Sequence, residues 1–199
     1  VMTKGEQSRQ RLIDCAAELF WKNGYAATGI SEILNASGLP KGSFYFYFKS
    51  KEELAVAVVS YYQAALLDKM RVFAANRTWE EFVKDVFAYL ENLSAGSALR
   101  GCPFAVMGME LAFQRPEIAK SYLNGLTQFQ ALFRGVLLQS GLSQPHADVL
   151  SERLIAVYQG NLLLGRISQE RGYLGCAKES MLQMYKEYRA VYGIASSEE

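Results

Sequence analysis

Apolar residues recur at helical spacing along almost the whole chain, and no segment of useful length alternates between apolar and polar residues as a half-buried strand does. Residues 6–23 show the pattern, because Leu12, Ala16 and Phe20 fall on one face of a helix. We therefore predict an all-α fold of about nine helices. The predicted helices span residues 6–23, 29–36, 41–48, 51–76, 79–93, 102–113, 116–139, 145–171 and 176–192.

Capping residues and glycines mark the ends of the predicted helices. Ser50 and Glu53 form a capping box at the start of the fourth helix, and Thr28 can cap the second helix. Gly24 stops the first helix, and Gly38 makes a tight turn after the second helix.

The helices change in character near residue 50. The first 50 residues hold three short helices, whereas the later helices are longer and more apolar. We therefore place a domain boundary after residue 52, between a small head of residues 1–52 and a larger helical body of residues 53–199.

Composition and charge exclude several kinds of protein. Half of the 199 residues are hydrophobic, and the formal net charge is +1, so a nucleic-acid site must be a local patch. No apolar run approaches 18 residues and the first residues lack the apolar core of a signal peptide, so we expect neither a membrane partner nor secretion. The three cysteines are widely separated, which indicates free thiols in a reducing cytoplasm.

The chain offers little from which to build a catalytic or metal site. His146 is the only histidine, and the sequence has no paired carboxylates at a catalytic spacing and no phosphate-binding glycine loop. The cysteines show no zinc-binding spacing. We therefore predict no enzyme activity, no catalytic residue, no cofactor and no metal ion.

Residues 28–48 combine a helix, a turn that contains Gly38 and a second helix, which is the geometry of a helix-turn-helix. In such units the second helix lies in the major groove of DNA while the first helix braces it. Ile33 and Leu39 are among the apolar residues that would hold the two helices together. The same spacing fits a plain hairpin of core helices or an adaptor that binds protein, and it leaves these alternatives open.

Five consecutive aromatic residues form most of the second helix of this motif. Phe44 and Phe48 stand four residues apart, so they share a face and can pack against the first helix, with help from Phe46. Tyr45 and Tyr47 fall on other sides, where a phenol can contact a phosphate or a thymine methyl group.

The stretch "RLIDCAAELFWKNGYAATGISEILNASGLPKGSFYFYFKSKEEL", residues 11–54, resembles the N-terminal domain of the tetracycline-repressor (TetR) family of bacterial transcription factors. Tyr47 departs from the family pattern, which usually has histidine there, and Pro40 replaces a common serine. The resemblance implies a DNA-binding surface, with the contribution of Lys49 left open. The implied DNA-binding residues are Thr28, Ser31, Lys41, Gly42, Ser43, Tyr45, Tyr47 and Lys51.

The resemblance also implies partners. Family members are homodimers that bind palindromic double-stranded DNA operators, and a small molecule bound in each body changes the spacing of the two heads. Recognition helices must lie about 34–36 Å apart to reach successive major grooves. The resemblance therefore implies a ligand-responsive repressor that a small hydrophobic or electrophilic effector releases from its operator.

Two C-terminal helices supply the candidate dimer surface, because their apolar residues extend over much of the circumference. The alternative is that these residues form only the core of the body. The candidates are Leu150, Leu154, Val157, Leu162, Leu164, Met181, Tyr185, Tyr188 and Tyr192.

Aromatic residues and methionines of the body could line an apolar ligand cavity, although side chains of this kind at helical spacing are also typical of a core. Gln128, Gln159 and Asn161 are candidate polar groups. The predicted ligand-binding residues are Cys102, Phe104, Met107, Phe113, Phe129, Phe133, Tyr158 and Asn161.

Cys102 lies at a predicted helix start beside Arg100, a position that favours the thiolate form. Residues 29–59 and the pair Gly101–Cys102 before a body helix resemble the N-ethylmaleimide-reductase-repressor branch of the family, which implies sensing of electrophiles. Arg166 replaces a lysine that the branch would have, and arginine is a poor nucleophile. A buried cysteine that only packs is the alternative.

Overall fold

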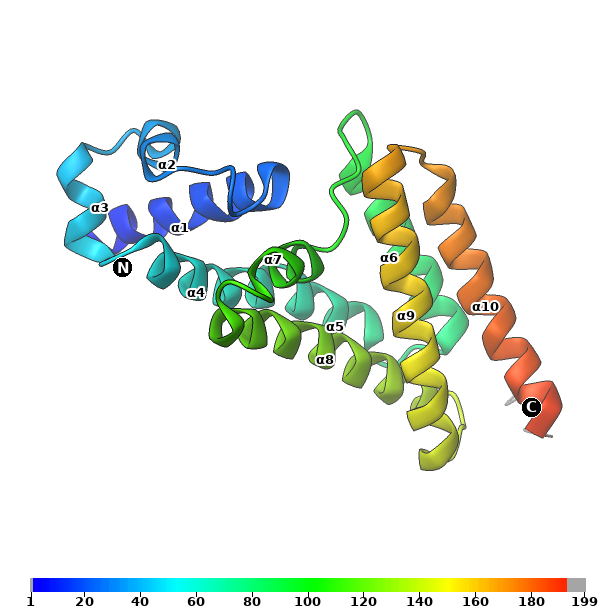
Figure 1. Cartoon of the computed structure of the whole chain (residues 1–199). Helices are drawn as coiled ribbons and strands as arrows, with labels where there is room; N and C mark the ends of the chain where they lie inside the picture. The colour runs from blue at the N-terminus through cyan, green and yellow to red at the C-terminus, as the bar shows by residue number, and fades with distance from the viewer. Residues whose placement is uncertain (1, 193–199) are drawn as a thin grey trace. The chain divides into compact units, whose positions relative to one another are not determined.

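The computed structural model describes residues 2–192, which are helical over most of their length and contain no β-strand (Figure 1). The predicted all-α class is confirmed. The elements are α1 (Lys4–Asn23), α2 (Ile30–Ser37), α3 (Lys41–Tyr47), α4 (Lys51–Tyr62), the π-helical turn η1 (Gln63–Leu67), α5 (Asp68–Ala74), α6 (Trp79–Ser94), α7 (Pro103–Leu111), α8 (Pro116–Gln139), α9 (Gln144–Ser168) and α10 (Gly172–Tyr192).

The chain packs as two compact units, and each unit draws on two stretches of sequence. The first unit consists of residues 1–66 and 103–126, and the second consists of residues 67–102 and 127–199. Helix α7 and the first half of α8 therefore belong to the same unit as the helix-turn-helix, and α7 packs against α1 and α4. The predicted domain boundary after residue 52 stays a prediction. Residues 1 and 193–199 lie outside the described residues.

The core of the first unit forms around α1. Leu12, Ala16 and Phe20 are fully buried, as the spacing along α1 predicts, and α1 packs against α2, α4 and α7. The phenol of Tyr62 on α4 donates a hydrogen bond of 2.6 Å to the carbonyl of Ala17. Full burial of a side chain such as Phe20 contributes about 1.5–3 kcal/mol, so this face of α1 contributes several kcal/mol to the stability of the unit.

Several helix ends differ from their predictions; α9 ends at Ser168 rather than at residue 171, and α10 begins at Gly172 rather than at residue 176. Helix α1 begins earlier than expected, because Thr3 and Glu6 form a reciprocal capping box. Thr28 does not cap α2; the N-cap is Gly29, and no side chain caps this helix. The hydroxyl of Thr28 instead donates a hydrogen bond to the carbonyl of Gly24, so the side chain is turned towards the preceding turn.

The stretch predicted as one helix over residues 51–76 is divided in three. Helix α4 runs into the π-helical turn η1, and α5 follows directly. A π-helical turn inserts one residue into the hydrogen-bond ladder and changes the direction of the side chains that follow. The change falls where the chain passes from the first unit to the second.

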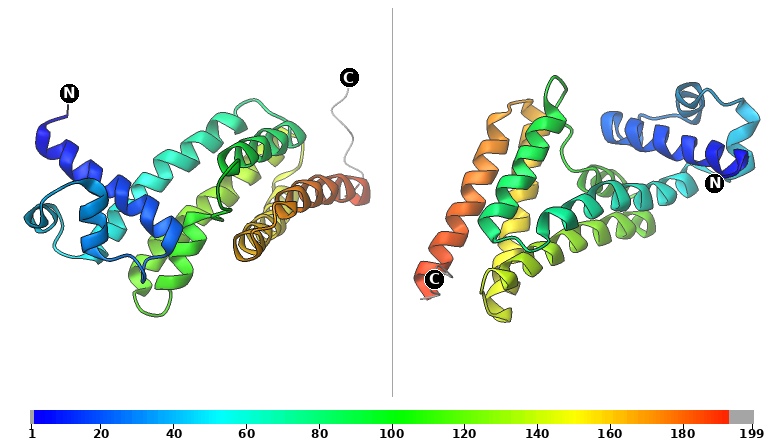
Figure 2. Two further views of the ribbon diagram at one scale, coloured as in Figure 1. Left: turned by 90° about the horizontal axis from the view of Figure 1, so that it is seen from above. Right: turned by 180° about the vertical axis from the view of Figure 1, so that it is seen from behind.

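In the second unit α9 and α10 lie side by side and antiparallel, and α6 packs against α10 (Figures 1 and 2). Trp79, the first residue of α6, is fully buried. Its backbone N–H donates to the hydroxyl of Ser140 at 2.8 Å, and its ring meets those of Phe82, Phe133 and Tyr185 at 5.5–6.2 Å. The N-terminus of α6 is thereby fixed inside the second unit.

Among residues 2–192, none of the helices combines the length with the apolar character that crossing a bilayer requires.

Candidate nucleic-acid interface and effector site

The turn between α2 and α3 depends on the left-handed conformation of Gly38, with φ at +65°. The N–H groups of Gly38 and Leu39 donate to carbonyls in the last turn of α2, which ends this helix. Pro40 then adopts an extended conformation as the N-cap of α3. The sequence therefore makes the sharp reversal that a helix-turn-helix needs.

The aromatic residues of α3 separate into buried and exposed sets. Phe44 and Phe48 are buried with their ring centroids 6.0 Å apart. Tyr45 and Phe46 are 68% and 80% exposed. The expectation that Phe46 helps to hold α3 against its brace is wrong, because residue 46 lies about 200° around the helix from residue 44. Phe46 adds an apolar ring to the outer surface of α3.

Tyr47 occupies the end of α3 and is half-buried. Its ring lies 4.8 Å from that of Phe46, measured between centroids. Its hydroxyl lies 3.7 Å from the position that a Cβ atom would take at Gly5, so the phenol reaches the first turn of α1. The ring is therefore supported by the N-terminus of the chain.

The other predicted DNA-binding residues differ in exposure. Lys41 and Gly42 are exposed at the start of α3, and Ser43 is half-buried. Ser31 is exposed on the first turn of α2, whereas Thr28 is completely buried. The buried hydroxyl of Thr28 is already engaged with a backbone carbonyl and does not face solvent.

Lys51 makes contacts that the sequence does not predict. Its ammonium group donates hydrogen bonds of 3.0 Å to the carbonyls of Tyr25 and Thr28. The same nitrogen lies 4.2 Å from the centroid of the Tyr25 ring, in a cation–π contact. Lys51 therefore ties the start of α4 to the turn that leads into α2.

Helix α7 contributes to the same turn through Glu110. Its carboxylate accepts a hydrogen bond of 2.9 Å from the backbone N–H of Ala26, 84 residues earlier in the chain. Gly24, with φ at +92°, leaves the space that this carboxylate occupies. Sequence reasoning missed this contact, since nothing local to residue 110 indicates a partner in the turn between α1 and α2.

The predicted ligand-binding residues divide between the two units. Phe104 and Met107 are fully buried in the first unit. Phe113 does not match the prediction: it is 97% exposed, because it lies in the turn between α7 and α8, and it lines no interior. The members in the second unit are Cys102, Phe129, Phe133, Tyr158 and Asn161.

Tyr158 lies at the centre of a cluster of aromatic rings in the second unit. The ring cluster consists of Tyr158, Phe87, Phe129 and Phe133, with centroids of the last three 5.7–6.4 Å from that of Tyr158. Burial raises the pKa of the Tyr158 phenol above its usual range, and nearby Cys102 adds to this shift. The centre of the cluster is therefore apolar and holds a neutral phenol.

Asn161 and Cys102 are the remaining predicted ligand-binding residues of the second unit. Asn161 donates its amide N–H to the carbonyl of Val157 on the same helix, at 2.9 Å. Cys102 directly precedes α7, at the predicted helix start, and is buried. Arg166 donates a hydrogen bond of 2.6 Å to the carbonyl of Arg100, which fixes the segment that leads to Cys102.

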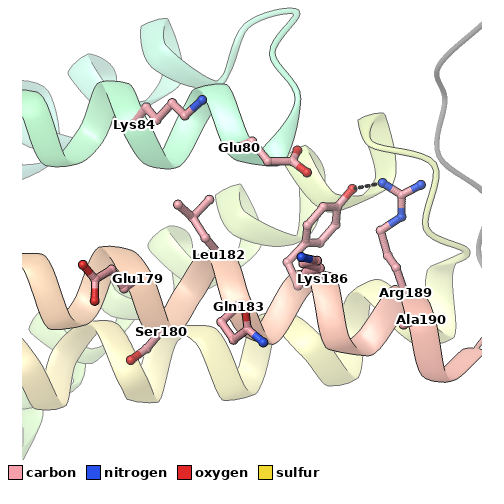
Figure 3. A pocket seen from close by; sticks show the side chains of 10 residues that line it. Glu80, Lys84, Glu179, Ser180, Leu182, Gln183, Lys186, Arg189 and Ala190 are labelled. Carbon is pink, nitrogen blue, oxygen red and sulfur yellow. Dashed lines mark hydrogen bonds between the residues drawn. The ribbon is translucent and has the colours of Figure 1, made fainter.

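An open groove of about 1,030 Å³ lies between α6 and α10 in the second unit (Figure 3). Its walls carry charged side chains of both signs, among them Glu80, Lys84 and Lys186. Arg189 donates a hydrogen bond of 3.3 Å to the hydroxyl of Tyr185 at one end of the groove. None of the predicted ligand-binding residues lines this groove, and its charged walls do not suit a small apolar molecule.

Part of the candidate dimer surface is buried inside the second unit of a single chain. Six of the predicted residues are buried in the second unit: Leu150, Leu154, Leu162, Met181, Tyr185 and Tyr188. The core alternative therefore holds for these six. The large apolar side chains of α9 and α10 that remain exposed are Val149, Leu163, Leu164, Ile167, Val191 and Tyr192.

Comparison with known proteins identifies relatives of both parts of the chain. Residues 12–58 match the model of the bacterial regulatory proteins of the tetR family, and residues 78–180, more than half of the chain, match that of the LmrA/YxaF-like transcriptional regulator C-terminal domain. The chain is 24% identical over 177 residues to YxaF of Bacillus subtilis, an uncharacterized HTH-type transcriptional regulator, with 85% of this chain and 91% of that protein covered.

A solved structure and a second relative add to this picture. The crystal structure of a TetR transcriptional regulator from Legionella pneumophila matches with a TM-score of 0.79 at 22% identity, over 92% of this chain and 97% of that one. The transcriptional repressor NemR of Escherichia coli is 40% identical, but over only 58 residues, or 29% of each chain. The predicted placement in the N-ethylmaleimide-reductase-repressor branch therefore stays a prediction.

Proposed function

Because the chain belongs to the TetR family of bacterial transcriptional regulators, we propose that it is a repressor that binds a palindromic operator as a homodimer and leaves it when a small molecule binds the body. The relatives are transcriptional regulators, and the chain is a regulator rather than an enzyme. A protein that acts on bacterial operators works in the cytoplasm, where the DNA lies.

The observation that carries this proposal is the presentation of α3. Phe44 and Phe48 anchor the helix by one face, so Tyr45 and Phe46 project from the other side beside Lys41. A lysine at this position would neutralise a phosphate and set the register, and the exposed rings would contact base edges in the major groove.

We assign DNA contact to those predicted residues whose side chains or backbone are accessible. Thr28 and Lys51 fall outside this group, because their polar atoms already bind carbonyls in the turn between α1 and α2. These two residues would act by positioning α2 and α3. The proposed contact residues are Ser31, Lys41, Gly42, Ser43, Tyr45 and Tyr47.

Substitution of Tyr45 tests the assignment of α3. Tyr45→Ala should weaken binding to DNA from upstream of the protein's own gene by roughly 10- to 100-fold in a gel-shift titration, because a base contact contributes about 1–3 kcal/mol. Phe113→Ala removes an even more exposed ring of the same unit and serves as the control. Equal affinities of the two variants would show that α3 does not read the operator.

A helical adaptor that binds protein is the second candidate. The exposed rings of Tyr45 and Phe46 and a net charge of only +1 are the observations that favour it. The two candidates differ in salt dependence: binding to DNA should weaken steeply as salt rises, since phosphate contacts release counterions. A gel shift without any retarded band at low salt would favour the adaptor.

We place the dimer surface on the exposed apolar side chains of α9 and α10. Val149, Leu163 and Ile167 recur at helical spacing along α9, which fits a four-helix bundle made by two copies. Sedimentation velocity should give a dimer for the wild-type protein and a monomer for Ile167→Glu. A dimer that survives this substitution would move the interface elsewhere.

The ring cluster around Tyr158 is the proposed effector site for a small hydrophobic molecule. Electrophilic effectors would act through Cys102, which is buried beside this cluster. Treatment with a maleimide should release DNA from the wild-type protein and not from Cys102→Ser. If both proteins release DNA equally, Cys102 only packs.

A further inference from the structure

Gln159, on α9 of the second unit, has a side-chain amide with no hydrogen-bond partner in the part of the chain that the structure describes. Its Nε2 and Oε1 atoms are both buried, and neither forms a hydrogen bond with any group among residues 2–192. Buried amides are almost always hydrogen-bonded, because leaving donor and acceptor without partners is costly once water is excluded. An orphaned pair of this kind calls for an explanation.

The position of Gln159 on α9 locates this amide. Residue 159 lies seven residues before Arg166, which corresponds to two turns on the same face, or about 10 Å along the axis. That face approaches the segment before α7: the Leu162 carbonyl and the Arg166 side chain lie 3.3 and 3.4 Å from where a Cβ at Gly101 would be. Gln159 therefore lies on the face of α9 that meets the segment ending at Cys102.

The ring cluster lies at the same level along α9 as this amide, because Tyr158 is the residue before Gln159 and the helix rises about 1.5 Å per residue. Tyr158 precedes Gln159 and packs against Phe129 and Phe133. Cys102 lies close enough to Tyr158 to affect its ionisation. An unsatisfied polar group, a set of apolar rings and a buried thiol thus occur in one region of the second unit.

We propose that Gln159 recognises the polar group of the effector, and that this effector is a small neutral molecule with an apolar ring and a carboxamide or lactam. The proposal rests on the proposed function, since it specifies the ligand of the same body. The amide of Gln159 would form two hydrogen bonds with the ligand, and the ring cluster would contact the apolar part.

The chemistry of the amide selects this class of ligand. A primary amide presents one acceptor and two donors side by side, and a carboxamide or a lactam matches both functions at once. Buried charges are disfavoured in an apolar surrounding unless they are paired, so a neutral group fits better than a carboxylate or an amine. A pure hydrocarbon would leave the amide unsatisfied.

Two probes separate polar recognition from apolar contact. Benzamide carries a ring and a carboxamide, whereas ethylbenzene carries a ring alone. Calorimetric titration of the DNA-free protein should show benzamide bound by the wild type, with affinity lowered roughly 10-fold or more in Gln159→Leu. Ethylbenzene should bind the two proteins with similar affinity. Equal benzamide affinities, or no binding to the wild type, would overturn the proposal.

A second measurement needs no ligand. Gln159→Leu removes a buried donor and acceptor without changing the size of the side chain much, so the free protein should melt at a higher temperature. Gln128→Leu is the matched control: the amide oxygen of Gln128 accepts a hydrogen bond from Arg71, so the variant should gain nothing. A lower melting temperature for Gln159→Leu would mean that the amide is already satisfied, and would refute the inference.

Failure of the inference can be told from failure of the proposed function. If benzamide binds through Gln159 but leaves operator DNA bound, the recognition stands and the proposed release mechanism fails. If a different molecule releases DNA from the wild type and from Gln159→Leu at equal concentrations, the repressor stands and the role of Gln159 fails.

Discussion

Substitution of Lys51 by methionine separates two roles for one positive charge. The first role is a bond to an operator phosphate, which the family resemblance implies. The second is the fixing of the turn between α1 and α2 through the carbonyls of Tyr25 and Thr28. Lys51→Met keeps the apolar stem of the side chain and removes only the ammonium group, so its effects report on the charge.

The contacts of Lys51 set the size of the expected effect. A hydrogen bond from a charged donor contributes about 1.5–3 kcal/mol, and a cation–π contact such as that with Tyr25 contributes about 0.5–1 kcal/mol. Water can replace part of this at a half-buried site, so we expect a net loss of about 2 kcal/mol. In a chain of this length such a loss lowers the melting temperature by roughly 4–8 °C.

Two assays distinguish the roles. Thermal unfolding followed by circular dichroism measures stability, and operator affinity at several salt concentrations counts phosphate contacts. Each contact contributes roughly −0.9 to the slope of the logarithm of affinity against the logarithm of salt concentration. Lys51→Met should lower the melting temperature and leave this slope unchanged. Lys49→Met, at an exposed neighbouring lysine, is the control for stability.

The opposite outcome would refute the positioning role. If Lys51→Met unfolds at the wild-type temperature and its salt slope is smaller in magnitude by about one, Lys51 binds a phosphate as the resemblance implies. Lys41→Met provides the reference for a true phosphate contact, because Lys41 is exposed at the start of α3.

Four further substitutions, one of them measured against pH, test the turns, a buried hydrogen bond and a helix cap. Gly38→Ala should lose about 1–2 kcal/mol from its positive φ alone. Gly24→Ala should lose more in urea unfolding, because its φ of 92° and ψ of 161° form a conformation that is nearly restricted to glycine, and because the added Cβ would push the Glu110 carboxylate away from the Ala26 N–H. Tyr122→Phe removes a buried hydrogen bond of 2.7 Å and should lower stability by about 1 kcal/mol in the same assay. Hydrogen bonds from the backbone and side chain of Thr78 lower the pKa of Glu81. The stability that Glu81 contributes is therefore present above its ordinary pKa of 4.5 and is lost as pH falls through the lower pKa of the folded state. When the pH is lowered from 4.5, the urea midpoint of the wild type should decrease more steeply than that of Glu81→Gln.

Much of the structure of the head, residues 1–52, could be predicted from the local spacing of residues. The separation of four residues between Phe44 and Phe48 correctly indicated two buried rings, and Gly38 correctly indicated the turn, since both depend on the geometry of a single helix or turn. The same helical period excludes Phe46 from the buried face, so the prediction that Phe46 packs against the first helix of the motif contradicts the spacing itself.

Contacts between distant parts of the chain were beyond local reasoning. Thr28 has the composition of a helix cap, but its hydroxyl finds the carbonyl of Gly24 in the folded turn. The Glu110 carboxylate reaches Ala26 only because α7 packs against α1, next to the turn that holds Ala26. Capping propensity and charge pattern describe one segment at a time, whereas these choices depend on which partner the tertiary structure supplies.

Gln159 and Asn161 show the same limit inside the body. From the sequence both are candidate polar groups, since both carry amides near Tyr158 on one helix, and the predicted ligand-binding set includes Asn161 alone. In the folded chain the shorter side chain of Asn161 donates back to the carbonyl of Val157, four residues earlier, and its donor is used. Gln159 carries its amide one methylene further from the backbone, and the amide is buried without a partner within residues 2–192. The two amides differ only in the folded chain, where one donates to its own helix and the other keeps a donor and an acceptor with which a ligand can form hydrogen bonds.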